Sequence, residues 1–172
     1  FLEGHFTPRV GALVYISPRH NFRASYQTGF RNPSSQDLYI SLDVSQVVII
    51  GTSPDSVDRF TMDLVGQSSL DSYTITGNMV QNNSYTLAAA GGVFEKAELD
   101  YVKPEFVKTK EFGYRYNGKK VSVDISAYWS KFTDFITEVQ VITPLYGSVA
   151  NLSGAAAVAA GDFRAFSWNT NT

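Results

Sequence analysis

Two stretches of sequence decide the fold: NFRASYQTGFRNP at residues 21–33 and VSVDISAYWS at residues 121–130. Side chains along a β-strand alternate between the two faces of a sheet, so each stretch divides into two sets. In both stretches one set is apolar and aromatic, and the other set is polar and carries charges. Strands of about ten residues with one wide apolar face and one charged face suit a wall between lipid and a water-filled lumen.

The same alternation continues through residues 105–116 and assigns individual side chains to each face. The side chains predicted to face lipid are Phe22, Tyr26, Phe30, Tyr114, Val123, Ile125 and Trp129. Those predicted to face the lumen are Arg23, Gln27, Arg31, Glu111, Arg115, Asp124, Ser126 and Tyr128. A soluble β-sandwich would use the same aromatic residues as its core, so the aromatic residues alone do not decide between the two folds.

Composition narrows the class of protein. A chain of 172 residues with 44% apolar content is large enough and apolar enough to fold. The 14 Lys and Arg nearly balance the 16 Asp and Glu, so we expect no nucleic-acid partner. The absence of Cys excludes disulfides and thiolate chemistry within these residues. No window reaches the roughly 20 apolar residues of a membrane-spanning helix, whereas barrel strands leave the mean hydropathy near zero, as in the value of -0.11 here.

The predicted strands alternate with short and long connections. They lie at about residues 8–17, 21–31, 105–116, 120–137 and 162–172. The short turns are predicted at 18–21 and at 117–119, where Asn117-Gly118 suits a two-residue hairpin turn. The long loops are predicted at about 32–104 and 138–161. Bacterial outer-membrane barrels have tight periplasmic turns and long extracellular loops, so we place the turns in the periplasm and the loops outside.

The connection at 32–104 is far longer than an ordinary loop and must contain structure of its own. Ser53-Pro54-Asp55 resembles a helix start, which predicts a helix over about 54–65. A second helix is predicted from Tyr85 to Ala90, ended by Gly91-Gly92. Residues 71–78 between them fit either a strand or irregular structure.

Residues suited to enzymatic or metal chemistry are scarce. His5 and His20 lie near predicted strand ends without the spacing of metal ligands, so we interpret them as ordinary surface histidines. Asp55, Asp58 and Asp63 lie on or beside a helix start, whereas a calcium loop needs alternating Asp and a downstream Glu. The sequence also lacks a nucleophile elbow and a glycine loop. We predict no catalytic residue, no cofactor, no metal and no enzymatic activity.

Four stretches, in the same order, resemble characteristic elements of the TonB-dependent outer-membrane receptors. Residues 29–39, GFRNPSSQDLY, resemble that family's GFR-x-P-(S/T)-x-x-(E/D)-L-Y element, although Asn32 replaces the commoner Ala. VKPE at 102–105 and EFGY at 111–114 are similar to its L-K-P-E and E-x-G elements. Residues 128–136 are similar to an aromatic stretch that ends in (D/N)-x-I.

The resemblance implies an all-β fold, namely an antiparallel up-and-down meander that forms part of the wall of a 22-stranded transmembrane β-barrel, with long extracellular loops that contain short helices. The chain would be an internal piece from the C-terminal half of that barrel, without the plug domain. The implied function is import of a scarce nutrient across the bacterial outer membrane, such as an iron chelate, cobalamin, a glycan or a peptide. The implied partners are the plug domain of the full-length chain, a TonB-type energy-coupling protein, outer-membrane lipid and a small nutrient ligand.

Other functions remain open at this point. A soluble β-sandwich for binding or adhesion would need a second sheet over the apolar faces. An unplugged porin would need no energy coupling. A barrel protease or lipase would need Ser or Asp clustered with His at the strand tips, and neither His5 nor His20 is placed for that.

The predicted turn at Asn117-Gly118 predicts which charged side chains lie opposite each other in the sheet. It pairs Tyr114 with Val121 and places Glu111 directly opposite Asp124 on the lumen side. Because opposed like charges destabilise a sheet, this register requires cationic neighbours or screening by water. The expected neighbours are Arg115, Arg23 or Arg31, or donors from a plug.

Overall fold

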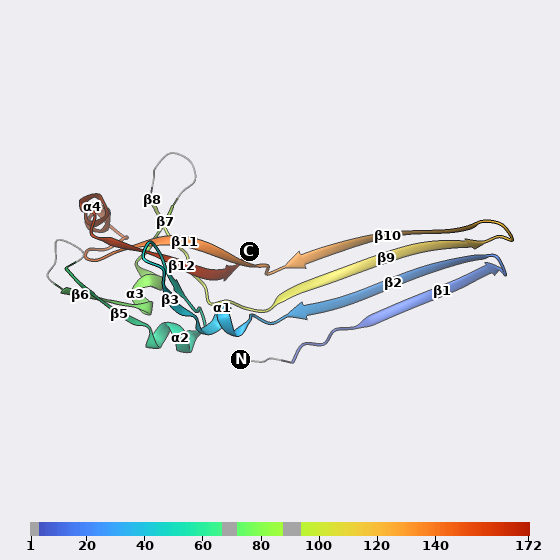
Figure 1. Cartoon of the computed structure of the whole chain (residues 1–172), viewed down its shortest axis with the longest axis horizontal. Coiled ribbons are helices and arrows are strands. Elements are labelled where there is room, and N and C mark those ends of the chain that lie inside the picture. The colour runs from blue at the N-terminus through green and yellow to red at the C-terminus, as the bar shows by residue number, and fades with distance from the viewer. Residues whose placement is uncertain (1–3, 67–71, 88–93) are drawn as a thin grey trace. The chain divides into compact units, whose positions relative to one another are not determined.

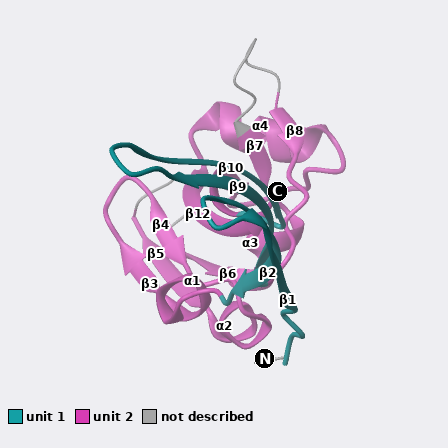
Figure 2. Ribbon diagram, turned by 90° about the vertical axis from the view of Figure 1, so that its right-hand side faces the viewer, with its two compact units in different colours: residues 1–32, 104–135 teal, residues 33–103, 136–172 magenta. Residues whose placement is uncertain are grey.

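The computed structural model describes residues 4–66, 72–87 and 94–172. The chain divides into two compact units, coloured separately in Figure 2. Unit 1 consists of Phe1–Asn32 and Pro104–Phe135, and unit 2 consists of Pro33–Lys103 and Ile136–Thr172. Each unit is therefore assembled from two separate segments of the chain.

Unit 1 is a four-stranded antiparallel sheet in which the strands lie side by side (Figure 1). The strands, in spatial order, are β1 (Arg9–Ser17), β2 (His20–Arg31), β9 (Glu105–Asn117) and β10 (Ser122–Thr133). Each strand pairs with the next one along the chain within this unit, which is an up-and-down meander. Within the described residues β1 and β10 are open edges, so this sheet does not close into a barrel.

The ladders on both sides of β9 run without a register shift. The β2–β9 ladder runs from the pair His20 and Tyr116 to the pair Arg31 and Glu105. The β9–β10 ladder runs from Ser122 opposite Asn117 to Thr133 opposite Phe106. Because residues directly opposite each other in an antiparallel pair point to the same face, these ladders fix which side chains share a face.

The predicted two-residue turn at Asn117-Gly118 is wrong. A type I′ turn needs a positive φ angle at both central residues, and neither Asn117 nor Gly118 has one. Instead, the chain reverses over residues 118–121, where the Gly118 N–H donates to the Val121 carbonyl at 2.9 Å. The longer turn changes the register, so Asp124 lies opposite Arg115 and Glu111 lies opposite Tyr128.

The predicted strand at 120–137 is also wrong, because the chain turns at its far end. β10 ends at Thr133, Asp134 has a left-handed φ of 56°, and β11 (Ile136–Pro144) begins in unit 2. The last strand, β12 (Phe163–Asn171), pairs with β11 and not with β10. The prediction that 162–172 continues the same wall is therefore not what the structure shows.

Unit 2 contains a six-stranded sheet, a separate two-stranded hairpin and short helices. The six-stranded sheet has the order β3 (Ser41–Asp43), β4 (Val48–Ile50), β12, β11, β7 (Tyr85–Leu87) and β8 (Phe94–Lys96). The hairpin consists of β5 (Thr61–Val65) and β6 (Ser72–Thr76). The helices are α1 (Ser35–Tyr39), α2 (Pro54–Arg59), α3 (Gly77–Asn82) and α4 (Leu152–Ala160). No helix in the described parts of the chain is both long enough and apolar enough to span a bilayer.

The sequence predicted where α2 begins but not where it ends. α2 begins as predicted, with the Ser53 side chain accepting the Ser56 N–H and Pro54 in the first turn. It ends at Arg59, because the following residues pair with β6 as a strand, so the predicted helix to residue 65 is too long. The helix predicted over 85–90 is wrong at residues 85–87, which form β7, and its remainder lies outside the described residues.

The core of unit 2 joins its two chain segments. β12 supplies Phe166 and Trp168, both fully buried, which pack with residues of the first segment such as Ile50 and Val57. The Trp168 indole N–H donates to the Asp100 carbonyl at 2.9 Å, so its polar atom is satisfied. Unit 2 thus has its own hydrophobic core, although the sequence predicted most of it as two long loops and only residues 162–172 as a strand.

Phe166→Ala should destabilise unit 2 by about 3–5 kcal/mol, because it removes a fully buried ring from this core. Phe163→Ala, on the same strand but 39% exposed, is the control and should cost less than about 1 kcal/mol. The measurement is the rate of proteolysis within residues 33–103 of the full-length protein in detergent. Equal rates for the two variants would contradict the assignment of Phe166 to the core.

Candidate functional site

The candidate site is the pair of faces presented by the four-stranded sheet of unit 1. The observed register places all of the side chains predicted to face the lumen on one face, here called the polar face. It places all of those predicted to face lipid on the other, here called the apolar face. What each face meets stays a prediction.

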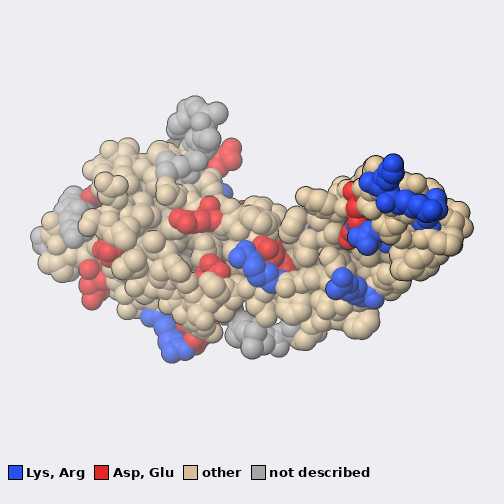
Figure 3. Space-filling model, turned by 45° about the vertical axis from the view of Figure 1, so that its right-hand side comes forward, with Lys and Arg blue, Asp and Glu red and all other residues tan. Residues whose placement is uncertain are grey.

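An ion cluster occupies the polar face near the short turns. The Arg115 guanidinium donates to Asp124 through Nε at 2.8 Å and Nη2 at 2.6 Å. Arg23 Nη2 lies 3.1 Å from the other oxygen of Asp124, and Arg23 Nε lies 3.5 Å from Glu111 Oε1. Figure 3 shows basic and acidic side chains next to one another over the part of the molecule at the right of the view. The cluster therefore balances its charges within the sheet.

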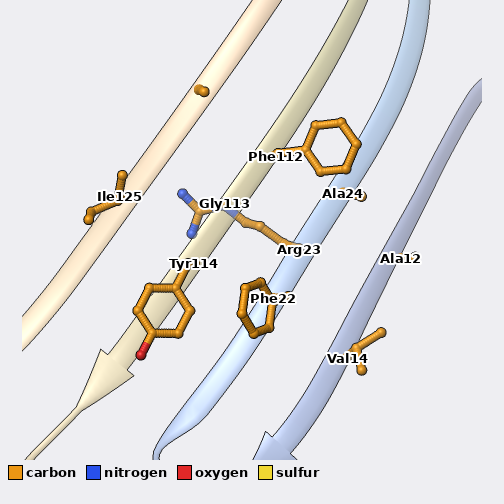
Figure 4. Close-up of a pocket in the computed structure, with 10 residues that line it drawn as sticks. Ala12, Val14, Phe22, Arg23, Ala24, Phe112, Gly113, Tyr114 and Ile125 are labelled. Atoms are coloured by element: carbon orange, nitrogen blue, oxygen red, sulfur yellow. The ribbon is translucent and has the colours of Figure 1, made fainter.

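Gly113 makes this cluster possible. Arg23 on β2 and Asp124 on β10 are separated by the intervening strand β9, and Arg23 pairs directly with Gly113 on that strand. Figure 4 shows the Arg23 side chain running from β2 across β9 at Gly113. A Cβ atom at position 113 would lie 2.4 Å from Arg23 Nε, closer than real contacts allow. Any other residue at position 113 would force the Arg23 side chain out of this position.

The structure corrects the expectation about Glu111 and Asp124. They lie on the same face but are not directly opposite each other, because the turn at 118–121 shifts the register. Arg23 lies between them and pairs with both. The expected cationic neighbours Arg23 and Arg115 are present, whereas Arg31 pairs with Glu105 at 2.9 Å instead.

Sequence reasoning missed the role of Gly113, although a signal was present. A glycine inside a strand weakens the strand and often marks the close approach of another group. Gly113 is the glycine of the E-x-G element, in an otherwise regular alternating strand. The identity of the approaching group required the register with β2, which no local pattern contains.

The apolar face exposes large side chains. Ile125 is 61% exposed and Trp129 is 58% exposed, and Phe22, Tyr26 and Val123 are 36–45% exposed. Two shallow hollows lie on this face. One of about 450 Å³ is lined mainly by Ala12, Ala24, Phe22, Phe112 and Tyr114 (Figure 4). A β-sandwich would bury these residues under a second sheet, and the described residues of unit 1 form a single four-stranded sheet.

The remaining candidate residues have ordinary partners. His20 shares a hydrogen bond of 2.7 Å with the Tyr114 hydroxyl, and the His5 ring packs edge-on against Phe30 and Phe106. The carboxylates of Asp55, Asp58 and Asp63 accept hydrogen bonds from Arg59, Asn78 and Thr74 respectively. Among residues 4–66, 72–87 and 94–172, no group of three or more His, Cys, Asp or Glu could hold a metal ion.

Comparison with known families decides the class of protein. The family model described as TonB dependent receptor-like, beta-barrel matches residues 2–171. The chain belongs to this family. The match covers both units of this TonB-dependent receptor barrel domain, including residues 40–101, to which the motif resemblance did not extend. No curated protein and no solved structure matches the chain. Members of the family are outer-membrane transport receptors and not enzymes.

Gly113→Ala in the full-length receptor should lower its thermal stability, because the added methyl group displaces Arg23 from its carboxylate partners. Arg23→Ala removes the obstructing side chain, so the double variant should lose less than the sum of the two single losses. The measurement is the temperature at which the folded band disappears in heat-modifiability electrophoresis. Gly11→Ala is the matched control, since a Cβ there meets nothing closer than 3.9 Å. Additive losses would contradict the crossing.

Proposed function

We propose that this chain forms part of the wall of an outer-membrane active transporter that imports a scarce nutrient with TonB-coupled energy. The observation that carries the proposal is the unequal distribution of charge between the two faces. One face holds the internally balanced ion cluster, and the other exposes Phe112, Ile125 and Trp129 with no acidic residue among the described residues of its strands. The apolar face meets lipid, and the polar face meets the lumen of a 22-stranded barrel that holds a plug domain. The short turns of unit 1 face the periplasm.

The ion cluster is compatible with a barrel wall from which a plug domain must be able to move away. Its charges are satisfied by one another, so withdrawal of a plug leaves no buried, unpaired charge in the wall. Its side chains are also 34–49% exposed, and partly exposed ion pairs contribute little binding energy individually. Guanidinium groups still have further N–H donors for carbonyl groups of the plug. The wall can therefore hold the plug loosely and release it.

Unit 2 is the candidate for ligand capture. It comprises both long connections of the sequence analysis, and its own core gives it a defined surface. We assign it to the extracellular side, where it contributes to binding or closure over the nutrient. The classes of nutrient are those of the family resemblance, namely an iron chelate, cobalamin, a glycan or a peptide.

An uptake assay tests the function. Cells that lack the receptor should lose uptake of one of these nutrient classes at limiting concentration, and cells that lack the energy-coupling protein should lose it equally. Restoring the full-length receptor should restore uptake only where the coupling protein is present. Uptake that persists without the coupling protein would indicate an unplugged porin and would overturn the proposal.

Cysteine labelling tests the two faces separately. Ile125 and Ser126 are neighbours on β10 that point to opposite faces, and this chain contains no native cysteine. In whole cells, Ser126→Cys should react with a small water-soluble maleimide when the plug is removed, and Ile125→Cys should not. Ile125→Cys should instead be modified by a lipid-soluble reagent. The reverse pattern would show that the faces are assigned the wrong way round.

A further inference from the structure

Three lysines lie together on the apolar face at the ends of the strands far from the short turns. Lys131 on β10 lies directly opposite Lys108 on β9, and Lys110 lies opposite Trp129. We call Lys108, Lys110 and Lys131 the lysine cluster. All three are exposed.

The two faces of the sheet divide the charged residues by type. The acidic residues of the four strands, Glu105, Glu111 and Asp124, all lie on the polar face. Lysines occupy the apolar face with no acidic residue among the described residues of its strands. Asp134, the acid closest in sequence to Lys131, lies beyond the end of β10. The apolar face therefore carries three positive charges that its own strands do not balance.

This arrangement is unfavourable unless an anion compensates it. Directly opposed like charges, such as Lys108 and Lys131, destabilise a sheet. No ion pair found among the described residues includes any of the three lysines. The nearest aromatic partner is the Trp129 ring, whose centroid lies 5.8 Å from Lys110 Nζ. A cation–π contact attracts one ammonium group but leaves the net charge in place.

The position of the cluster along the strands matches a membrane surface. From Val123 to Lys131, β10 rises about 27 Å along the strand. At a tilt of 35–45°, this distance spans roughly 19–22 Å along a barrel axis, against an apolar band of about 25 Å. Lysine stems extend further and carry their ammonium groups out towards water. The lysine cluster therefore lies near the border of the apolar band, where lipid headgroups are found. The aromatic residues Phe30 and Phe106 lie two residues further from the short turns, as in the aromatic girdles of barrels.

An apolar hollow adjoins Lys110 on the same face. It has a volume of about 480 Å³, and its lining includes Val10, Ala12, Ala24, Tyr26, Phe112 and Lys110 itself. It shares Ala12, Ala24 and Phe112 with the hollow in Figure 4, so the two form one trough over small residues. A positive cluster beside an apolar trough is complementary to a phosphate group attached to an acyl chain.

We propose that the lysine cluster binds the phosphorylated headgroup of an outer-membrane lipid, one of whose acyl chains lies in the adjoining trough. The inference rests on the proposed function, because it requires the apolar face to meet the membrane. With the short turns in the periplasm, the site belongs to the external leaflet. The bound lipid neutralises the opposed lysines and so stabilises the β9–β10 pair.

The test uses the full-length receptor in nanodiscs that contain either bisphosphorylated lipid A or only phosphatidylcholine. Lys108→Gln combined with Lys131→Gln should weaken lipid A binding roughly thirtyfold, since each lysine beside an anionic surface contributes a factor of about five. Lys119→Gln combined with Lys120→Gln removes the same charge from the short turn and should leave binding unchanged. The charge-conserving pair Lys108→Arg and Lys131→Arg should retain most of the binding, which separates loss of charge from misfolding.

The outcomes distinguish the lipid site from the proposed function. The lipid site is wrong if the receptor with Lys108→Gln and Lys131→Gln binds lipid A as tightly as the unmodified receptor does. It is also wrong if the unmodified receptor binds inorganic phosphate as tightly as lipid A. If one of these two results is found but Ile125→Cys stays protected from water-soluble reagents, the lipid site is wrong and the transporter proposal survives. If Ile125→Cys reacts with water-soluble reagents, both proposals fail.

Discussion

The unbroken register of β2, β9 and β10 is the constraint on which the two faces of unit 1 depend. In an antiparallel sheet a slip of one residue moves every side chain of a strand to the opposite face. Here such a slip would bring the arginines and carboxylates among the exposed aromatic residues. In this register Arg23 lies opposite Gly113, where its side chain crosses β9 without meeting a Cβ atom. The crossing therefore favours the observed register.

Arginines and lysines are also divided between the polar face and the apolar face. Arginine presents a planar fork that pairs with carboxylates in a fixed geometry, and Arg23, Arg31 and Arg115 all pair with acids on the polar face. Lysine has a flexible apolar stem with a compact charge at its tip, which suits a face that is apolar near the backbone and wet at its border. The residue types thus distinguish the two faces more sharply than net charge does, since the whole chain is nearly neutral.

Unit 2 shows why long connections in such a protein fold. A segment as long as residues 33–103 carries many apolar side chains, but its described strands are only three to five residues long. The second segment supplies β11 and β12, which occupy the centre of the six-stranded sheet. Phe166 and Trp168 of β12 then bury against the first segment. Neither segment would complete this core alone.

The sequence by itself determined the β class, the positions of β1, β2 and β9, and the division of the side chains of β2, β9 and β10 into two faces, because alternation along a strand is a local property of the backbone. It also located the start of α2, because a Ser cap followed by Pro acts within one turn. Only the tertiary structure decided the turn at 118–121, the end of β10 at Asp134, the partner strands of β12 and the crossing of Arg23 over Gly113. Each of these depends on which distant strand lies alongside, and that choice is made by the packing of residues far apart in the chain.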